Sequence, residues 1–245
     1  MILLGHKLMN YLIYVFFGLA PSLIWLAYFL RKDVHPESNR KILQIFFYGG
    51  LSTIPAAVIE FILFRVTMAL LTPTSSRLFY FIIEIGQTII GVALVEEYIK
   101  YLVVKRKVLN DPELDEPIDA MLYMIIAALG FAAVENILYL TERQFSDALQ
   151  ISILRFAFAT FLHTLSSGLL GYFLALSFYE PMKRFGLVAG GLILATLFHG
   201  FYNLSLIKIN PDIKFFSTAL VISILAVIVS LGFKNIKKMA STCKV

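Results

Sequence analysis

The stretch GVALVEEYIKYLVVKRK, residues 91–107, places three charged side chains inside an otherwise apolar segment. Glu96, Glu97 and Lys100 lie in its middle, and a basic cluster, Lys105 to Lys107, closes it. A charge at the centre of a membrane helix costs about 2.5–3.5 kcal/mol on insertion scales, and such residues usually face a bundle interior or a wet cavity. The stretch therefore predicts a membrane helix with a functional polar face.

The composition indicates an integral membrane protein. Of 245 residues, 59% are hydrophobic, and the mean hydropathy of +0.82 exceeds what one soluble core needs. The net charge of +5 comes from short basic clusters beside apolar runs, which fits membrane topology better than nucleic-acid binding. Cys243 is the only cysteine, so an intrachain disulfide and a Cys-ligated zinc site are excluded.

A bilayer core of about 30 Å needs about 20 apolar residues per helix, and this length predicts seven spans. Their ranges are 10–30, 43–71, 78–104, 118–140, 149–178, 185–207 and 215–233. The first is too long for a cleaved signal peptide and is expected to be a retained helix. No linker or soluble domain interrupts the chain, so we predict a single all-α membrane domain, residues 1–245, with its core at 78–207.

The positions of lysine and arginine predict the orientation, because cytoplasmic loops collect these residues. Most of the 21 Lys and Arg lie in the segments that are inside if the N-terminus is outside. The predicted topology is therefore N-out and C-in, as a multi-pass protein of the cell membrane that contacts the lipid bilayer.

Four successive predicted spans, the third to the sixth, each carry a polar stripe, within EEYIK, GFAAVEN, HTLSS and HGFYN. Residues four apart share one helical face, and the pairs here are Glu96 with Lys100, Phe131 with Glu135, His163 with Ser167, and His199 with Asn203. We expect these four spans to enclose one buried polar site. The helical rise places Glu96 roughly 13 Å, and the other three key residues roughly 20 Å, from the cytoplasmic boundary.

The four motifs, in this order, resemble the PrsW family of intramembrane proteases. That family belongs to a larger group that includes the CAAX-processing endopeptidases and the gamma-secretase subunit APH-1. APSLIWLAYFLRKD and PIDAMLYMIIAALGFAAVEN are also similar to PrsW sequences, so the resemblance covers roughly residues 18–205. Glu135 stands where CAAX endopeptidases usually have histidine, and Lys100 where they usually have arginine, which argues against processing of prenylated proteins.

Hydrolysis of an amide bond requires activated water and donors for the developing oxyanion. We expect Glu96 to be the base, with Glu97 as the alternative, and Lys100 to compensate the pair. Glu135 is expected to orient water or a histidine. His163 and His199 could polarise water, donate to the oxyanion or protonate the leaving group, and Asn203 could donate to the oxyanion or form an interhelical hydrogen bond. Phe131, Asn136 and Ser167 are expected to support the site.

Two histidines and two glutamates could also bind zinc, through Glu96, Glu135, His163 and His199, but the chain has no HExxH motif. A metal-free glutamate mechanism without a cofactor is therefore the favoured expectation. Glu60, Glu84, Gln87 and Arg155 are expected to form structural pairs or gate the site. Gly49, Gly50, Gly190 and Gly191 are expected to allow close helix approach.

The resemblance implies a single-span membrane protein as substrate, such as an anti-sigma factor cut near the outer side in a stress response. Two alternatives remain, the first from the resemblance and the second from the residues. One is a non-catalytic scaffold similar to APH-1, and the other is a proton- or ion-coupled transporter, which also needs carboxylates and histidines at mid-membrane.

Overall fold

A computed structural model describes residues 2–33, 35, 37–72 and 76–240, and every regular element among them is a helix. Cys243 lies outside the described residues. The elements, in chain order, are α1 (Ile2–Leu30), α2 (Asn39–Leu51), α3 (Thr53–Leu70), α4 (Arg77–Gly86), the π-helix η1 (Gln87–Leu94), α5 (Val95–Lys107), α6 (Pro117–Thr141), the 3₁₀ turn η2 (Phe145–Asp147), α7 (Ala148–Ala157), α8 (Ala159–Tyr179), the 3₁₀ turn η3 (Pro181–Lys183), α9 (Arg184–Lys208) and α10 (Pro211–Ala240).

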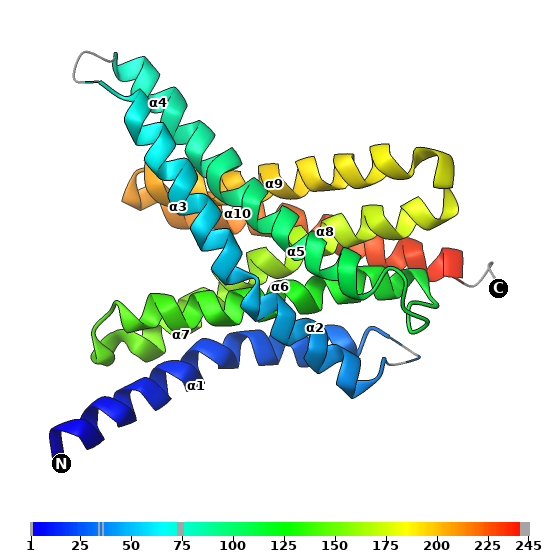
Figure 1. Ribbon diagram of the computed structural model, residues 1–245, viewed down its shortest axis with the longest axis horizontal. Coiled ribbons are helices and arrows are strands. Elements are labelled where there is room, and N and C mark those ends of the chain that lie inside the picture. The colour runs from blue at the N-terminus through cyan, green and yellow to red at the C-terminus, as the bar shows by residue number, and fades with distance from the viewer. Residues whose placement is uncertain (1, 34, 36, 73–75, 241–245) are drawn as a thin grey trace.

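These elements form seven segments that are long and apolar enough to cross a membrane, which confirms the predicted number and fold class. The segments are Met9–Leu30, Asn39–Leu70, Arg77–Lys107, Pro117–Thr141, Phe145–Tyr179, Pro181–Lys208 and Ile213–Met239. The two ends of the chain lie at opposite ends of the bundle, as an odd number of spans requires (Figure 1).

Three of the spans are not the continuous α-helices that the sequence suggested. The second breaks at Ser52, whose hydroxyl bonds the Gly49 carbonyl, because Pro55 has no N–H to continue the hydrogen-bond ladder. The third widens into η1 before Glu96, and such π turns rotate the following residues relative to an α-helix. The fifth breaks at Phe158, between α7 and α8.

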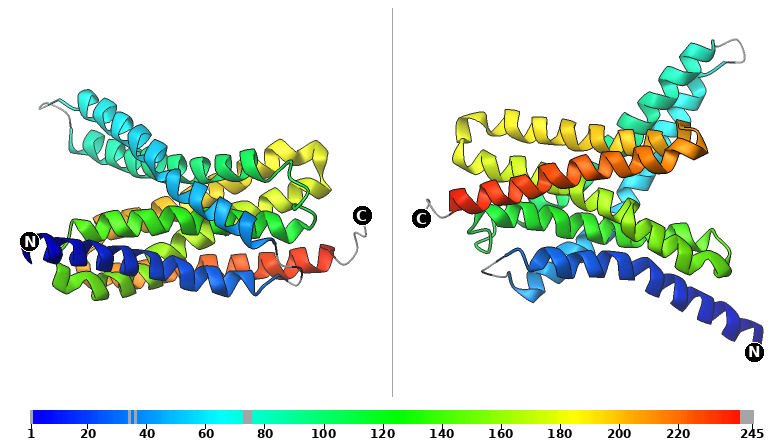
Figure 2. Two further views of the ribbon diagram at one scale, coloured as in Figure 1. Left: turned by 60° about the horizontal axis from the view of Figure 1, so that its bottom comes forward. Right: turned by 180° about the vertical axis from the view of Figure 1, so that it is seen from behind.

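Helix α6 is the centre of the bundle. It packs against α1, α2 and α8, and a larger share of it is buried than of any other span. Figure 1 shows α6 between α1 and α2 on one side and α8 to α10 on the other. Helices α3 and α4 form a hairpin that leans away from this bundle in both views of Figure 2. The polar residues of α5, α6, α8 and α9 therefore meet inside the protein, while much of the hairpin faces outward.

The loop between α5 and α6 is docked against the start of α2. Lys41 forms an ion pair with Asp111, and the Ser38 hydroxyl donates to Glu113 Oε2 at 2.9 Å. The hydrogen bond from Lys41 lowers the pKa of the Asp111 carboxyl. These contacts fix the end of the bundle where the basic clusters gather.

Two glycines allow α2 to lie directly on α6. A Cβ atom at Gly49 would lie 2.1 Å from the Ala127 carbonyl oxygen, and one at Gly130 would lie 1.9 Å from the Phe46 carbonyl oxygen. The expected close approach thus holds at Gly49. It does not hold at Gly190, which has no atom within 4 Å of such a Cβ position.

We predict that Gly130→Ala destabilises the protein by about 1–3 kcal/mol, because two backbones must separate to admit the methyl group. Gly190→Ala is the matched control, and its expected effect is neutral or slightly stabilising, since alanine favours a helix more than glycine does. Thermal unfolding of both purified variants in the same detergent measures the difference. Equal unfolding temperatures would contradict the close α2–α6 contact.

Candidate active site

The structure brings the polar stripes of four helices into one cluster. Glu96 and Glu97 stand at the start of α5, directly after η1, and Glu135 comes from α6. His163 of α8 and His199 of α9 have ring centroids 4.9 Å apart. Residues separated by more than 100 positions in the chain therefore share one site.

Lys100 is the fully buried cation at the centre of this cluster. Its ammonium lies 2.9 Å from Glu97 Oε1, 3.3 Å from Glu96 Oε2 and 2.8 Å from Nδ1 of His163. An ammonium has three N–H donors and no acceptor, so Nδ1 of His163 accepts and the ring proton is on Nε2. That Nε2–H donates to Glu135 Oε2 at 2.7 Å. One lysine therefore fixes the tautomer of His163.

Glu97 is fully buried and tightly held. Ser167 donates to its Oε2 at 2.6 Å, and Ser166 donates to its Oε1 at 3.0 Å. Nδ1 of His199 lies 2.9 Å from Oε1 and donates to it, because a carboxylate only accepts. Ser167 thus has a supporting contact, and Ser166 is a partner that the sequence analysis missed, since only Ser167 is four residues from His163.

Glu96 is less constrained than Glu97. Its Oε2 lies 3.6 Å from Nδ1 of His163 and 3.9 Å from Nε2 of His199. In the neutral form of His199 with its proton on Nδ1, Nε2 is the nitrogen that has the lone pair. One ring nitrogen of each histidine therefore lies within 4 Å of the same Glu96 oxygen, and the lone pair of His163 Nδ1 is held by Lys100.

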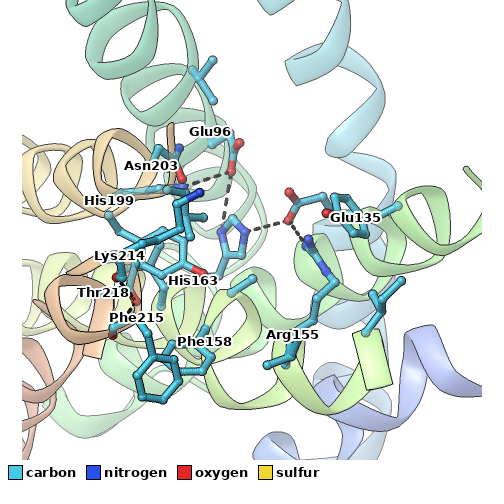
Figure 3. Close-up of a pocket in the computed structure, with 18 residues that line it drawn as sticks. Glu96, Glu135, Arg155, Phe158, His163, His199, Asn203, Lys214, Phe215 and Thr218 are labelled. Carbon is cyan, nitrogen blue, oxygen red and sulfur yellow. Dashed lines mark hydrogen bonds and ion pairs between the residues drawn. The ribbon is translucent and has the colours of Figure 1, made fainter. Parts of the chain in front are cut away.

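Glu135 is anchored by Arg155 as well as by His163. The Arg155 guanidinium lies 3.0 Å from Glu135 Oε2, and Figure 3 shows Glu135 in contact with both Arg155 and His163. Arg155 also donates to the Asn136 side chain, whose amide donates to the Gly18 carbonyl at 3.2 Å. Asn136 is therefore a bridge between helices, and Arg155 forms the structural pair that was expected of it.

Two further predicted residues lie at the edge of the cluster. The ring of Phe131 lies under the Lys100 ammonium, at 4.5 Å from its centroid. Asn203 lines the same cavity wall as His199, one turn further along α9. Neither belongs to the chain of ion pairs.

A cavity of about 550 Å³ opens beside the cluster (Figure 3). Glu96, Glu135, His163 and His199 all line it, whereas Glu97 and Lys100 do not. Its far wall is α10, with Lys214, Phe215 and Thr218, so the expected enclosure by the third to sixth spans is incomplete. The sequence signal that was missed is Lys214, a cation at the start of the last span. The remaining lining is mainly apolar.

Three ligand atoms in this cluster could hold a metal ion. One atom each from Glu96, His163 and His199 lies within 4.8 Å of the others. Two ligands bound at about 2.0–2.2 Å to a tetrahedral zinc lie about 3.3–3.6 Å apart, close to the separations of Glu96 from the two histidines. The second ring nitrogens of His199 and His163 bond Glu97 and Glu135, as zinc-binding histidines commonly bond a carboxylate.

A seven-span bundle that buries carboxylates and histidines beside a cavity defines a polytopic membrane protein with a buried polar centre. Residues 37–232 match the family described as "PrsW family intramembrane metalloprotease". The match covers most of the chain, and the protein belongs to this family. The predicted resemblance is thereby confirmed.

Several bacterial proteins named Protease PrsW are similar to the chain. That of Geobacillus kaustophilus is 28% identical over 187 residues, covering 76% of each chain. That of Oceanobacillus iheyensis is 29% identical and covers 76% of this chain and 79% of its own. That of Bacillus subtilis is 26% identical, covering 79% of this chain and 82% of its own. No solved structure matches the chain significantly.

We predict that Lys100→Met destabilises the protein by about 3–5 kcal/mol, because Glu97 loses its cation while staying buried. Lys105→Met is the control, since Lys105 is exposed near the end of the same helix. The double variant Glu97→Gln/Lys100→Met is expected to recover part of the loss. Thermal unfolding in detergent measures all three, and a Lys100→Met variant as stable as the control would refute the buried pair.

Proposed function

We propose that the protein is an intramembrane endopeptidase that hydrolyses peptide bonds of membrane-anchored proteins at the Glu96, His163 and His199 centre. The observation that carries the proposal is that one nitrogen of His163 and one of His199 lie within 4 Å of Glu96 Oε2, at the wall of the cavity. Membership of the protease family supports the reaction class.

Between the two adjacent glutamates, Glu96 is the better candidate for the reaction centre, as a ligand if the reaction uses zinc or as the base if it does not. It lines the cavity, and only one of its oxygens is engaged by Lys100. Glu97 does not line the cavity and is bound by Lys100, Ser166, Ser167 and His199. Its proposed role is to hold His199 so that Nε2 points at the reaction site.

The donor set fits zinc, and this fit supports a metal-dependent reaction over the metal-free form expected from the sequence. Glu96, His163 and His199 would hold the ion, which would lower the pKa of bound water and polarise the substrate carbonyl. Glu135 belongs outside the ligand set, because it accepts the Nε2 proton of His163. Binding through Nδ1 of His163 requires Lys100 to release that atom and to keep its contact with Glu97.

Donors for the developing oxyanion must come from other residues. In the neutral form of His199 with its proton on Nδ1, Nε2 offers a lone pair to a metal ion or to water and cannot donate. Asn203 lines the cavity and carries an amide that can donate. Arg155 also lines the cavity, although Glu135 already occupies part of its guanidinium.

The cavity suits a peptide segment from a membrane-spanning helix. Its walls are largely apolar, the polar residues of the candidate site gather around Glu96, and α10 adds Lys214 and Thr218 (Figure 3). We propose a single-span membrane protein as substrate. By family resemblance, an anti-sigma factor is the first candidate.

We predict that Glu96→Gln, His163→Ala and His199→Ala each abolish cleavage, and that Asn203→Ala lowers the rate about 10²-fold or more by removing an oxyanion donor. Glu84→Gln is the matched control, because Glu84 pairs with Lys208 away from the cavity. Co-expression with single-span membrane proteins tagged at both ends, followed by immunoblotting, measures cleavage. Unchanged cleavage by the stably inserted His163 and His199 variants would refute the proposal.

We predict that the purified protein contains stoichiometric zinc and that His199→Ala and Glu96→Gln lose it, while Glu84→Gln retains it. Elemental analysis of detergent-purified protein measures the metal directly. Cleavage is expected to stop with a membrane-permeant chelator and to return with added zinc. A metal-free preparation that cleaves at the full rate would instead support the glutamate mechanism expected from the sequence.

A further inference from the structure

A second cavity, of about 670 Å³, lies on another side of α8, between α1 and α10. None of the residues of the candidate active site lines it. One end is apolar and aromatic, with Ile24, Trp25 and Ala226 among its lining, and the other end has lysines. We call this space the aromatic cleft.

Trp25 forms a rigid wall of the aromatic cleft. Its ring stacks on Phe161 with centroids 4.1 Å apart and an interplanar angle of 5°, and on Phe156 at 5.1 Å. The indole Nε1–H donates to the Phe156 carbonyl at 3.0 Å, so the polar atom of the ring is satisfied. The Trp25 indole therefore contributes only apolar surface to the cleft.

Three lysines line the same cleft: Lys32, Lys234 and Lys237. Lys32 lies over the Tyr28 ring, at 4.6 Å from its centroid, and Lys234 and Lys237 are exposed. Among the described residues, none of the three forms an ion pair with a carboxylate. They lie where α1 ends and where α10 nears its end, at the end of the bundle that carries the basic clusters.

We propose that the aromatic cleft binds an anionic phospholipid of the surrounding bilayer, with an acyl chain along Trp25 and the headgroup phosphate at the lysines. From Ala226 to Lys237 the cleft extends about 16 Å along α10, the scale of an acyl-chain segment. Basic pockets between membrane helices on the cytoplasmic side are suited to such headgroups. A purely apolar occupant, such as a substrate helix, would leave three positive charges without a counter-charge.

The chain contains one tryptophan, which makes the test specific. The protein is placed in vesicles of equal parts phosphatidylglycerol and phosphatidylcholine, with brominated acyl chains on one lipid or on the other. Bromine quenches tryptophan fluorescence at short range, so Trp25 reports which lipid occupies the cleft. We expect stronger quenching when phosphatidylglycerol carries the bromine. Each single lysine-to-glutamine substitution should lower the preference about five-fold, and Lys32→Gln/Lys234→Gln/Lys237→Gln should abolish it.

The matched control is Lys105→Gln/Arg106→Gln/Lys107→Gln, which removes the same number of positive charges from the same end of the bundle without touching the cleft. It should keep the preference for phosphatidylglycerol. The proposal is overturned by equal quenching from the two brominated lipids or by quenching from neither, which would mean that protein fills the cleft. It is also overturned if the control loses the preference as fully as the cleft variant, since general surface charge would then explain it.

Discussion

The structure depends most on the burial of the Lys100 ammonium. An ammonium removed from water must place all three of its protons on acceptors, because every unmet donor costs several kcal/mol in a medium without water. The acceptors here come from Glu96 and Glu97 on the same helix and from His163 on another. The requirement therefore sets the distance between α5 and α8, and it fixes the protonated nitrogen of His163. Glu135 then accepts the hydrogen bond from the other ring nitrogen of His163, Nε2.

The connected cluster has an unbalanced charge. Three carboxylates, Glu96, Glu97 and Glu135, face two cations, Lys100 and Arg155, while the two histidines are neutral in the tautomers described above. A buried excess of one negative charge is costly unless a proton or a further cation compensates it. Lys100 engages only one oxygen of Glu96, and one nitrogen of each histidine lies within 4 Å of that residue, so compensation is best placed there. A shared proton at Glu96 neutralises the excess, and a divalent cation there would change it to one positive charge. In both cases the electrostatics of the bundle is linked to its proposed chemistry.

The sequence predicts some of this arrangement and not the rest, for physical reasons. Hydropathy over a span length gives the seven helices because the bilayer imposes that length. The spacing of four residues correctly paired Glu96 with Lys100, which are in contact at 3.3 Å. It could not foresee that Ser167 bonds Glu97 instead of its stripe partner His163, since that contact depends on how two helices are rotated. Arg155 was expected to form a structural pair, and it does so with Glu135. The wall that α10 adds to the cavity, by contrast, arises from tertiary packing that no local pattern encodes. A proline in a span is not a sufficient signal for a break, because the second span breaks at Ser52 near Pro55 whereas α1 continues through Pro21.

The two cavities share the junction of α7 and α8 as a common wall. Phe158 and Leu162 line the active-site cavity, while Phe156, Phe161 and Leu165 line the aromatic cleft. His163 lies within this same stretch, so a substitution of Phe161 or Phe156 would disturb the helix that positions the catalytic ring. The lysines at the far end of the cleft have no such connection, because they belong to the loop after α1 and to the last turns of α10. Loss of lipid preference through those lysines therefore reports on the cleft itself, whereas a loss through the aromatic wall would mix lipid binding with damage to the candidate active site.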